Sequence, residues 1–224
     1  NNLIRDQAMR REHELDEALQ VSEKFSDLCS ETMSNLRDLK DNLLSQEPPG
    51  VDSPTVQEQQ KELKELRKEL GKARLSLEEC RQLGDQLTGM VGEPGLVEIR
   101  KQLEDIHNLA DDVHDITRER DEDLKTALGH TDKFQELADS INSWLPTAEH
   151  KLANMKPIST NPETLNQQLE EIKSHKSQVH PHVAELQQLN QELGALKEMS
   201  QVAAEALQKP VHDINTKWQE GLKG

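Results

Sequence analysis

Three histidines lie close together in the sequence, and imidazole is a side chain often used for acid–base chemistry and for metal binding. His175 and His182 are seven residues apart, which places both on one face of a helix, whereas His180 should point elsewhere. A zinc site needs about four ligands, and no carboxylate or cysteine has a fixed position beside these rings. We therefore predict polar residues buried in a helix bundle, with no metal. If they are buried in the neutral form, acid should destabilise that bundle.

Cys29 and Cys80 are the only cysteines, and both fall at apolar positions of helical patterns. Their spacing matches no metal motif. They favour buried, reduced thiols in a cytosolic protein over a disulfide or a redox centre. The sequence also has no Gly-rich phosphate loop, no nucleophile elbow and no ordered set of Ser, His and Asp. It therefore predicts no catalytic residue, no enzymatic activity and no cofactor.

The composition favours thin-cored helical structure. Of 224 residues, 33% are hydrophobic and 31% charged, with no Tyr, two Phe and two Trp. Such a chain is too periodic for disorder and too charged for a large globular core. The formal net charge of −16 argues against binding to nucleic acid or anionic membranes, and no apolar run is long enough to predict membrane insertion. The apolar pattern is already under way at both ends of the chain, so we expect a fragment of a larger protein.

The elements that must position these residues are long helices. The strongest pattern is an apolar 3-4 alternation from Leu96 to Met155, which is typical of one helical face. A helix of this length would extend on the order of 90 Å, too long for one compact domain. Its polar exceptions all lie between Thr117 and Thr131, which suggests that one core ends and another begins there. We therefore predict one helix shared by two successive bundles.

Shorter patterns on either side predict four more helices. The first covers about residues 3–45, and the second begins with Ser53 as N-cap and Pro54 at the first helical position. Asn161 and Pro162 repeat this arrangement at the start of the fourth helix, and a weak turn near residues 199–201 leads into the last.

Glycine and two prolines interrupt these patterns. Gly84 is the weak point of the second helix, because glycine has low helix propensity. Pro146 predicts a kink in the long helix, and Pro210 predicts a kink or a late start in the last one.

The chain repeats itself at an offset of 109 residues. This offset pairs Arg11 with Arg120 and Leu15 with Leu124, and the same block continues beyond them. Further pairs are Phe25 with Phe134, Leu36 with Leu145, and Gln59 with Gln168. We expect the offset to drift to about 106 in the second helix of each unit, pairing Leu83 with Leu189, and to about 108 in the third.

Three long helices per unit, the third running on into the first of the next, resemble the spectrin repeat. Trp144 and Trp218 carry the resemblance, because both fall where that family places two core tryptophans that face each other. Arg11 and Arg120, each followed four residues later by leucine, resemble the R-x-x-x-L at the end of the family's third helix. The first unit has Asn35 at the position of Trp144, so a smaller core is expected there.

The resemblance implies an all-α, elongated rod of tandem three-helix bundles joined by a continuous helix. Residues 1–19 would end a preceding helix, 20–128 would form a first repeat, and 129–224 a second, C-terminally truncated one. The residues expected in the structural core are Trp144, Trp218, Phe25, Phe134, Leu36 and Leu145. The residues expected at the junction between repeats are Thr117, Arg120, Leu124, Leu128, Gly129 and Thr131.

Within this family, Leu145–Pro146 and the turn Met155–Ser159 look like the rod of spectraplakins, although dystrophin-like and nesprin-like rods share the general pattern. This resemblance implies a cytoplasmic, cytoskeletal spacer that sets distance and flexibility between terminal actin- and microtubule-binding domains. Actin and microtubules would then be partners through other domains of the parent protein. The fragment itself is expected to be monomeric.

Two other interpretations remain. One is a docking or self-association module on the rod surface, with exposed apolar residues such as Leu75 and Leu137 as its footprint. The other is a long dimeric coiled coil, which the proline-rich breaks near residues 48 and 157 disfavour.

Overall fold

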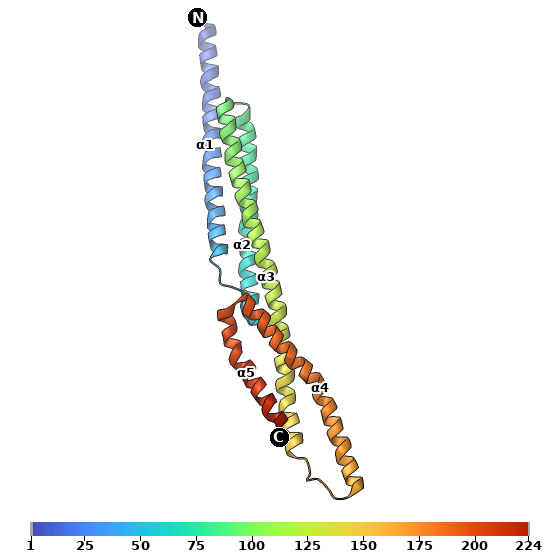
Figure 1. Cartoon of the computed structure of the whole chain (residues 1–224). Helices are drawn as coiled ribbons and strands as arrows, with labels where there is room; N and C mark the ends of the chain where they lie inside the picture. The colour runs from blue at the N-terminus through green and yellow to red at the C-terminus, as the bar shows by residue number, and fades with distance from the viewer. Residues whose placement is uncertain (1, 224) are drawn as a thin grey trace. The chain divides into compact units, whose positions relative to one another are not determined.

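The computed structural model describes residues 2–223, and this described part consists of five α-helices with no strand. The all-α class predicted from the sequence is confirmed. Across the described residues, no helix combines the length and apolar character needed to cross a lipid bilayer. The helices are α1 (Asn2–Leu44), α2 (Ser53–Thr88), α3 (Glu93–Ala153), α4 (Pro162–Met199) and α5 (Gln201–Lys223) (Figure 1).

The longest helix, α3, contains 61 residues and continues without a break through residues 117–131, as predicted. Pro146 lies inside α3, which nevertheless runs on to Ala153. Pro210 lies inside α5, and because α5 begins at Gln201 the predicted late start is wrong. A proline removes one hydrogen bond of its helix, and the flanking turns keep theirs. The predicted break between α4 and α5 is confirmed, with Ser200 as the residue between them.

The chain forms two compact units. Unit 1 contains the residues up to Glu47 together with Gln60–Glu122, and unit 2 contains Pro48–Gln59 together with the residues from Asp123 onward. Unit 1 is therefore built from α1 and parts of α2 and α3. Unit 2 is built from the start of α2, the second part of α3, and α4 and α5.

The N-cap residue predicted from the sequence is confirmed for α4 but not for α2. Asn161 caps α4 as predicted, because its side chain accepts hydrogen bonds from the backbone N–H groups of Glu163 and Thr164. The prediction of Ser53 as the cap of α2 is wrong. The Asp52 carboxylate accepts from the backbone N of Thr55 at 2.9 Å and so caps this helix. A carboxylate also gains from the helix dipole, which favours Asp over Ser here.

The core of unit 1 is a column of small and aliphatic side chains with a single aromatic ring, Phe25. Gly84, which the sequence predicts to be the weak point of α2, lies inside a continuous helix and at a close-packed position of this core. A Cβ there would lie 3.1 Å from Leu103 Cδ1 and 3.2 Å from Ile99 Cγ2. The buried side chains of unit 1 include Phe25, Cys29, Leu36, Leu39, Leu43, Leu63, Leu70, Ala73, Leu77, Cys80, Leu87, Ile99, Ile106, Ala110 and Val113.

The core of unit 2 is more aromatic. Trp144, Val179 and Leu186 pack against its edge and are only partly buried. The buried cluster of unit 2 comprises Phe134, Leu137, Ala138, Ile141, Leu145, Leu189, Leu193, Leu196, Val211, Ile214 and Trp218.

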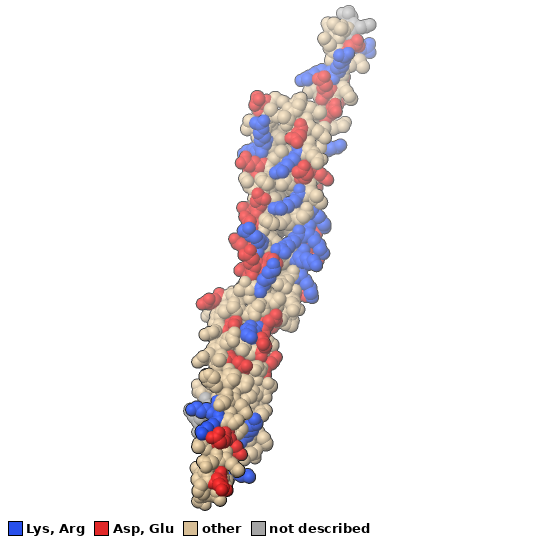
Figure 2. All heavy atoms as spheres, turned by 90° about the vertical axis from the view of Figure 1, so that its right-hand side faces the viewer, with Lys and Arg blue, Asp and Glu red and all other residues tan. Residues whose placement is uncertain are grey.

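The surface carries charges of both signs. On the face shown in Figure 2, Lys and Arg alternate with Asp and Glu, most densely over the bundle formed by α1, α2 and the first part of α3.

The burial of side chains shows that the repeat offset of 109 residues also holds between α2 and α4. Leu189 and Leu196 on α4 have 0% and 1% of their surface exposed, and so match Cys80 (0%) and Leu87 (2%) at an offset of 109. Leu83, the residue 106 positions before Leu189, is only half-buried. The predicted drift to 106 is therefore wrong, because apolar identity at Leu83 was a weaker signal than position in the core.

Candidate functional site: an aromatic groove in unit 2

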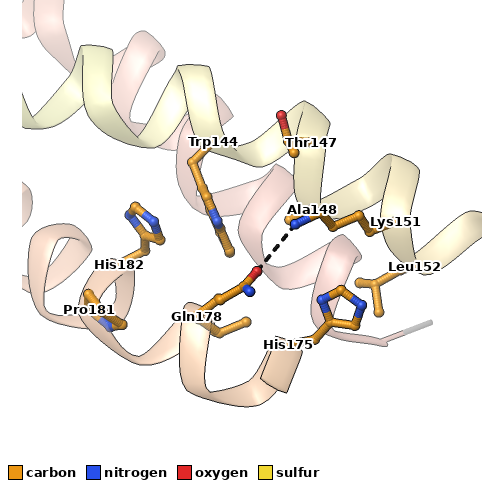
Figure 3. Close-up of a pocket in the computed structure, with 10 residues that line it drawn as sticks. Trp144, Thr147, Ala148, Lys151, Leu152, His175, Gln178, Pro181 and His182 are labelled. Atoms are coloured by element: carbon orange, nitrogen blue, oxygen red, sulfur yellow. Dashed lines mark hydrogen bonds between the residues drawn. The ribbon is translucent and has the colours of Figure 1, made fainter. Parts of the chain in front are cut away.

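Three rings from three helices meet at one end of the unit 2 core. The indole of Trp144 on α3 stacks on the imidazole of His182 on α4, with ring centroids 4.2 Å apart and planes 27° apart. The Trp144 and Trp218 rings are 5.5 Å apart and tilted by 38°. Figure 3 shows His182 and Trp144 projecting from α4 and α3 toward the same space. Offset and tilted ring pairs of this kind add stabilisation beyond the area they bury.

A carboxylate orients the stacked histidine. His182 Nδ1 lies 2.7 Å from Glu185 Oε2, and the Ser140 hydroxyl donates to the same oxygen at 3.0 Å. Although Ser, His and Glu are neighbours, the order of the contacts is wrong for hydrolysis. The hydroxyl donates to the carboxylate and not to the imidazole, so the ring has no serine proton to remove.

The other two histidines are not brought into a common site. His175 is half-buried, and His180 is exposed. Among residues 2–223 the structure forms no group of three His, Cys, Asp or Glu side chains suited to a metal ion. His182 itself is half-buried and has a carboxylate partner, whereas the sequence predicted an interior ring. Acid was expected to destabilise the bundle on the condition that the histidines are fully buried. His182 does not meet that condition.

A groove of about 370 Å³ opens beside the stacked rings, between α3 and α4. The Lys151 ammonium donates to Gln178 Oε1 at 3.3 Å across this groove, as the dashed line in Figure 3 marks. The groove is lined by Trp144, Thr147, Ala148, Lys151, Leu152, His175, Gln178, Val179, Pro181 and His182. Its walls suit an apolar side chain with a polar rim, which is the character of a protein-binding surface.

The six residues predicted for the core differ in burial. Phe25 and Leu36 are buried in unit 1, with 4% and 0% of their surface exposed. Phe134, Leu145 and Trp218 belong to the buried cluster of unit 2. The sixth, Trp144, packs at the edge of that cluster.

Two predicted junction residues are buried polar groups that their own helix satisfies. The Thr117 hydroxyl donates to the Val113 carbonyl at 2.6 Å, and the Thr131 hydroxyl donates to the Leu128 carbonyl at 3.0 Å. Both threonines are 3% exposed. Bonding to the preceding turn lets a threonine occupy a core position without an unpaired hydroxyl.

The remaining junction residues have different surroundings. Leu124 is fully buried, Leu128 is half-buried and Gly129 is exposed. A Cβ at Gly129 would meet nothing within 4 Å. The Arg120 guanidinium donates from Nη2 to the carbonyl of Glu47 in the loop after α1, within unit 1.

Sequence reasoning missed two glutamines that organise the interhelical loops. Gln59 Oε1 accepts from the Gly50 backbone N at 2.9 Å, and its Nε2 donates to the Pro48 carbonyl at 2.9 Å. Later in the chain, Gln168 accepts from Ser159 N at 3.1 Å and donates to the Pro157 carbonyl at 2.9 Å. The signal was present, because Gln59 and Gln168 are paired at the repeat offset.

The two apolar residues expected to be exposed behave differently. Leu75 is 70% exposed. Leu137 is 4% exposed and belongs to the buried cluster of unit 2, so its prediction is wrong. With Phe134, Ala138 and Ile141 also buried, the apolar face of α3 in unit 2 is wider than a strict 3-4 alternation.

Comparison with known proteins adds independent information. The family model described as "Spectrin repeat" matches residues 20–126 and 129–220. The human protein "Microtubule-actin cross-linking factor 1, isoforms 6/7" is 26% identical over 218 residues, which is 96% of this chain and 6% of the relative. The rat "Microtubule-actin cross-linking factor 1" is 24% identical over 218 residues, which is 96% of this chain and 4% of the relative. The chain therefore spans a small part of the length of these relatives.

Proposed function

Because the chain belongs to the spectrin-repeat family, we propose that it is a rod segment of a cytoskeletal crosslinking protein, with a mechanical and not an enzymatic role. In this proposal residues 20–128 and 129–224 are the two repeats, and residues 1–19 end a preceding helix. Actin and microtubules would be bound by other domains of a longer protein, in the cytoplasm and at the cytoskeleton. The names of the relatives and their 96% coverage of the chain support this assignment.

The observation that carries the proposal is the continuity of α3. This helix runs from Glu93 to Ala153 and supplies buried side chains to both units, from Ile99 in the first to Leu145 in the second. A helix shared in this way couples the unfolding of neighbouring repeats, because melting it removes packing from both. Residues 117–131, with Gly129 among them, are the proposed place where the rod bends or yields under load.

Substitution of Leu128 by proline tests this coupling. Both tryptophans lie in unit 2, so tryptophan fluorescence reports unit 2 alone, whereas far-ultraviolet circular dichroism reports helix in both units. In the unsubstituted chain the two urea transitions should coincide. In Leu128→Pro they should separate, because an interior proline costs about 3 kcal/mol and breaks the helix.

Leu128→Ala is the matched control, since it truncates the same half-buried side chain without a break in the backbone. Its two transitions should stay together at a slightly lower urea concentration. Coincident transitions in Leu128→Pro would contradict a mechanical coupling through α3.

A further inference from the structure

The groove beside Trp144 has a counterpart in unit 1. A second groove of about 370 Å³ lies between α1 and α2. Except for Leu152 and Val179, every residue that lines the groove of unit 2 lies 109 positions after a residue that lines the groove of unit 1. The two grooves are therefore the same feature of the repeated fold.

The third helix does not close this groove in unit 1. Lys40 on α1 pairs with Asp112 on α3 at 3.2 Å, and Arg67 on α2 pairs with Asp121 on α3 at 3.1 Å. The helix α3 therefore lies along the same stretch of α1 and α2 that forms the groove, and yet the lining comes from α1 and α2 alone. The groove thus opens on a side of the helix pair that a complete three-helix bundle leaves exposed.

The two grooves differ in charge. In unit 1 the lining contains the carboxylates of Asp38 and Glu69, and the Lys72 ammonium lies 2.7 Å from Glu69 Oε1. Among the described residues, no carboxylate lines the groove of unit 2, although the chain as a whole has a net charge of −16. The residues of unit 2 that correspond to the three charged ones are Thr147, Gln178 and Pro181.

Lys151 brings a positive charge to the groove of unit 2, where unit 1 has Asn42. Its ammonium donates to the amide oxygen of Gln178 at 3.3 Å, and this acceptor is neutral. Elsewhere in unit 2, Lys133 has a carboxylate partner, with Nζ 2.9 Å from Glu136 Oε2. A carboxylate from a partner molecule would give Lys151 a charged acceptor, which makes a stronger hydrogen bond than an amide does.

The groove of unit 2 also has an aromatic wall. The indole of Trp144 takes the place of Asn35, and Figure 3 shows it reaching from α3 toward α4. The stack on His182 holds this ring in place. The carboxylate of Glu185 is itself held by the His182 imidazole and the Ser140 hydroxyl. Tryptophan is enriched among the residues that contribute most to protein–protein binding.

We propose that the groove of unit 2 binds a segment of another protein in which a large apolar side chain is followed closely by a carboxylate. The apolar side chain packs against Trp144, and the carboxylate pairs with Lys151. A volume of about 370 Å³ is at the small end for ligand pockets, so the groove takes one or two side chains of the segment. Binding of this kind goes beyond the proposed rod role and does not depend on it.

Short synthetic peptides without tryptophan serve as probes. The acidic probe carries Leu, Phe and Glu in succession, the basic probe has Lys in place of Glu, and the polar probe has Ser in place of Leu and Phe. Both tryptophans of the chain lie in unit 2, so a fluorescence titration reports binding there. It is carried out at about 0.15 M ionic strength, where distant charges are largely screened.

The order of the three affinities decides the result. The acidic probe should bind saturably and more tightly than the basic probe, and the polar probe should not bind. Attraction by the net charge of −16 would favour the basic probe, so a preference for the acidic one has to arise locally.

Three substitutions separate the groove from overall charge. Lys151→Glu should weaken binding of the acidic probe by about five-fold, the upper value for an exposed ion pair, and should strengthen binding of the basic probe. Gln178→Glu gives Lys151 the carboxylate that Glu69 represents in unit 1, so it should weaken the acidic probe with almost no change in side-chain size. Lys133→Glu makes the same charge change outside the groove and should leave both affinities unchanged. The side chains of Lys151 and Gln178 are exposed, so circular dichroism should show unchanged helix.

Four results would overturn the proposal. The first is an acidic probe that does not bind saturably, and the second is a basic probe that binds as tightly as the acidic one. The third is a polar probe that binds as well as the acidic one, which would remove the role of the aromatic wall. The fourth is a Lys133→Glu chain that loses as much affinity as Lys151→Glu. None of these results bears on the coupling through α3 that Leu128→Pro tests.

Discussion

The Cys29 thiol on α1 lies close to the Cys80 thiol on α2 inside the core of unit 1, and both are buried. Burial, followed by the neighbouring Cys80 thiol, raises the pKa of Cys29 from 9.0 to about 12. Because the folded state holds this proton more tightly than the unfolded chain does, the associated stability is complete below pH 9. It is lost as the pH rises from 9 toward 12.

Replacement of Cys29 by alanine should remove this alkaline loss. The free energy of unfolding in urea, followed by circular dichroism, should fall between about pH 8 and about pH 10.5 in the unsubstituted chain. The fall should be smaller in Cys29→Ala, which lacks the ionisable group. Lysine titration affects both proteins alike, so an equal fall in the two would contradict the role of the thiol.

The stacking of His182 on Trp144 predicts a contrast between two substitutions. His182→Ala removes the ring and should lower the free energy of unfolding by about 0.5 to 1.5 kcal/mol, the contribution typical of a ring pair. His182→Phe keeps a flat ring but loses the bond to Glu185, so it should retain more stability than the alanine variant. Urea unfolding monitored by tryptophan fluorescence measures both. Equal losses would show that the stack itself contributes nothing.

Two glycines should respond to alanine in opposite ways. Gly129→Ala should stabilise the chain by up to about 1 kcal/mol, because alanine has the higher helix propensity and the new Cβ meets no atom within 4 Å. At Gly84 the same methyl group would press on Leu103 and Ile99. Gly84→Ala should therefore gain little or lose stability. Thermal unfolding followed by circular dichroism compares the two directly, and equal gains would refute the packing argument at Gly84.

The loop glutamines predict equivalent effects in the two halves of the chain. Gln59→Leu and Gln168→Leu each remove two hydrogen bonds to loop backbone, at a cost of about 1 to 3 kcal/mol. Gln167→Leu serves as the control, since its exposed side chain neighbours Gln168 without holding the loop. A control as damaging as Gln168→Leu, measured by urea unfolding, would rule out the hydrogen bonds as the cause.

Long-range periodicity made most of the fold predictable. A helix from Glu93 to Ala153 follows from a 3-4 apolar alternation in which only Thr117, Arg120 and Thr131 are polar. Local hydrogen-bonding chemistry was harder to foresee. Asp52 and Ser53 are both good capping residues, and only the backbone geometry decides that Asp52 accepts from Thr55 while Ser53 donates to Asp132.

The aromatic groove was the least predictable feature. His182 lies on the apolar face of its helical pattern, and periodicity assigned it to the interior, whereas the family resemblance placed Trp144 in the core. Their half-buried positions depend on how α3, α4 and α5 pack together, which is a property of three helices and not of one. Leu137 was misjudged for a related reason, because the width of a helix face is set by its neighbours.

The loop after α1 and the first turns of α2 have a consequence for protein engineering. Pro48–Gln59 belongs to unit 2, although the chain on either side of it belongs to unit 1. A single cut within α3 would thus not yield the second unit intact, because Val56, which is fully buried, would remain on the wrong fragment. Swapping or deleting one unit of this protein requires two breakpoints. A hybrid joined at only one of them would have a cavity in the core of a unit.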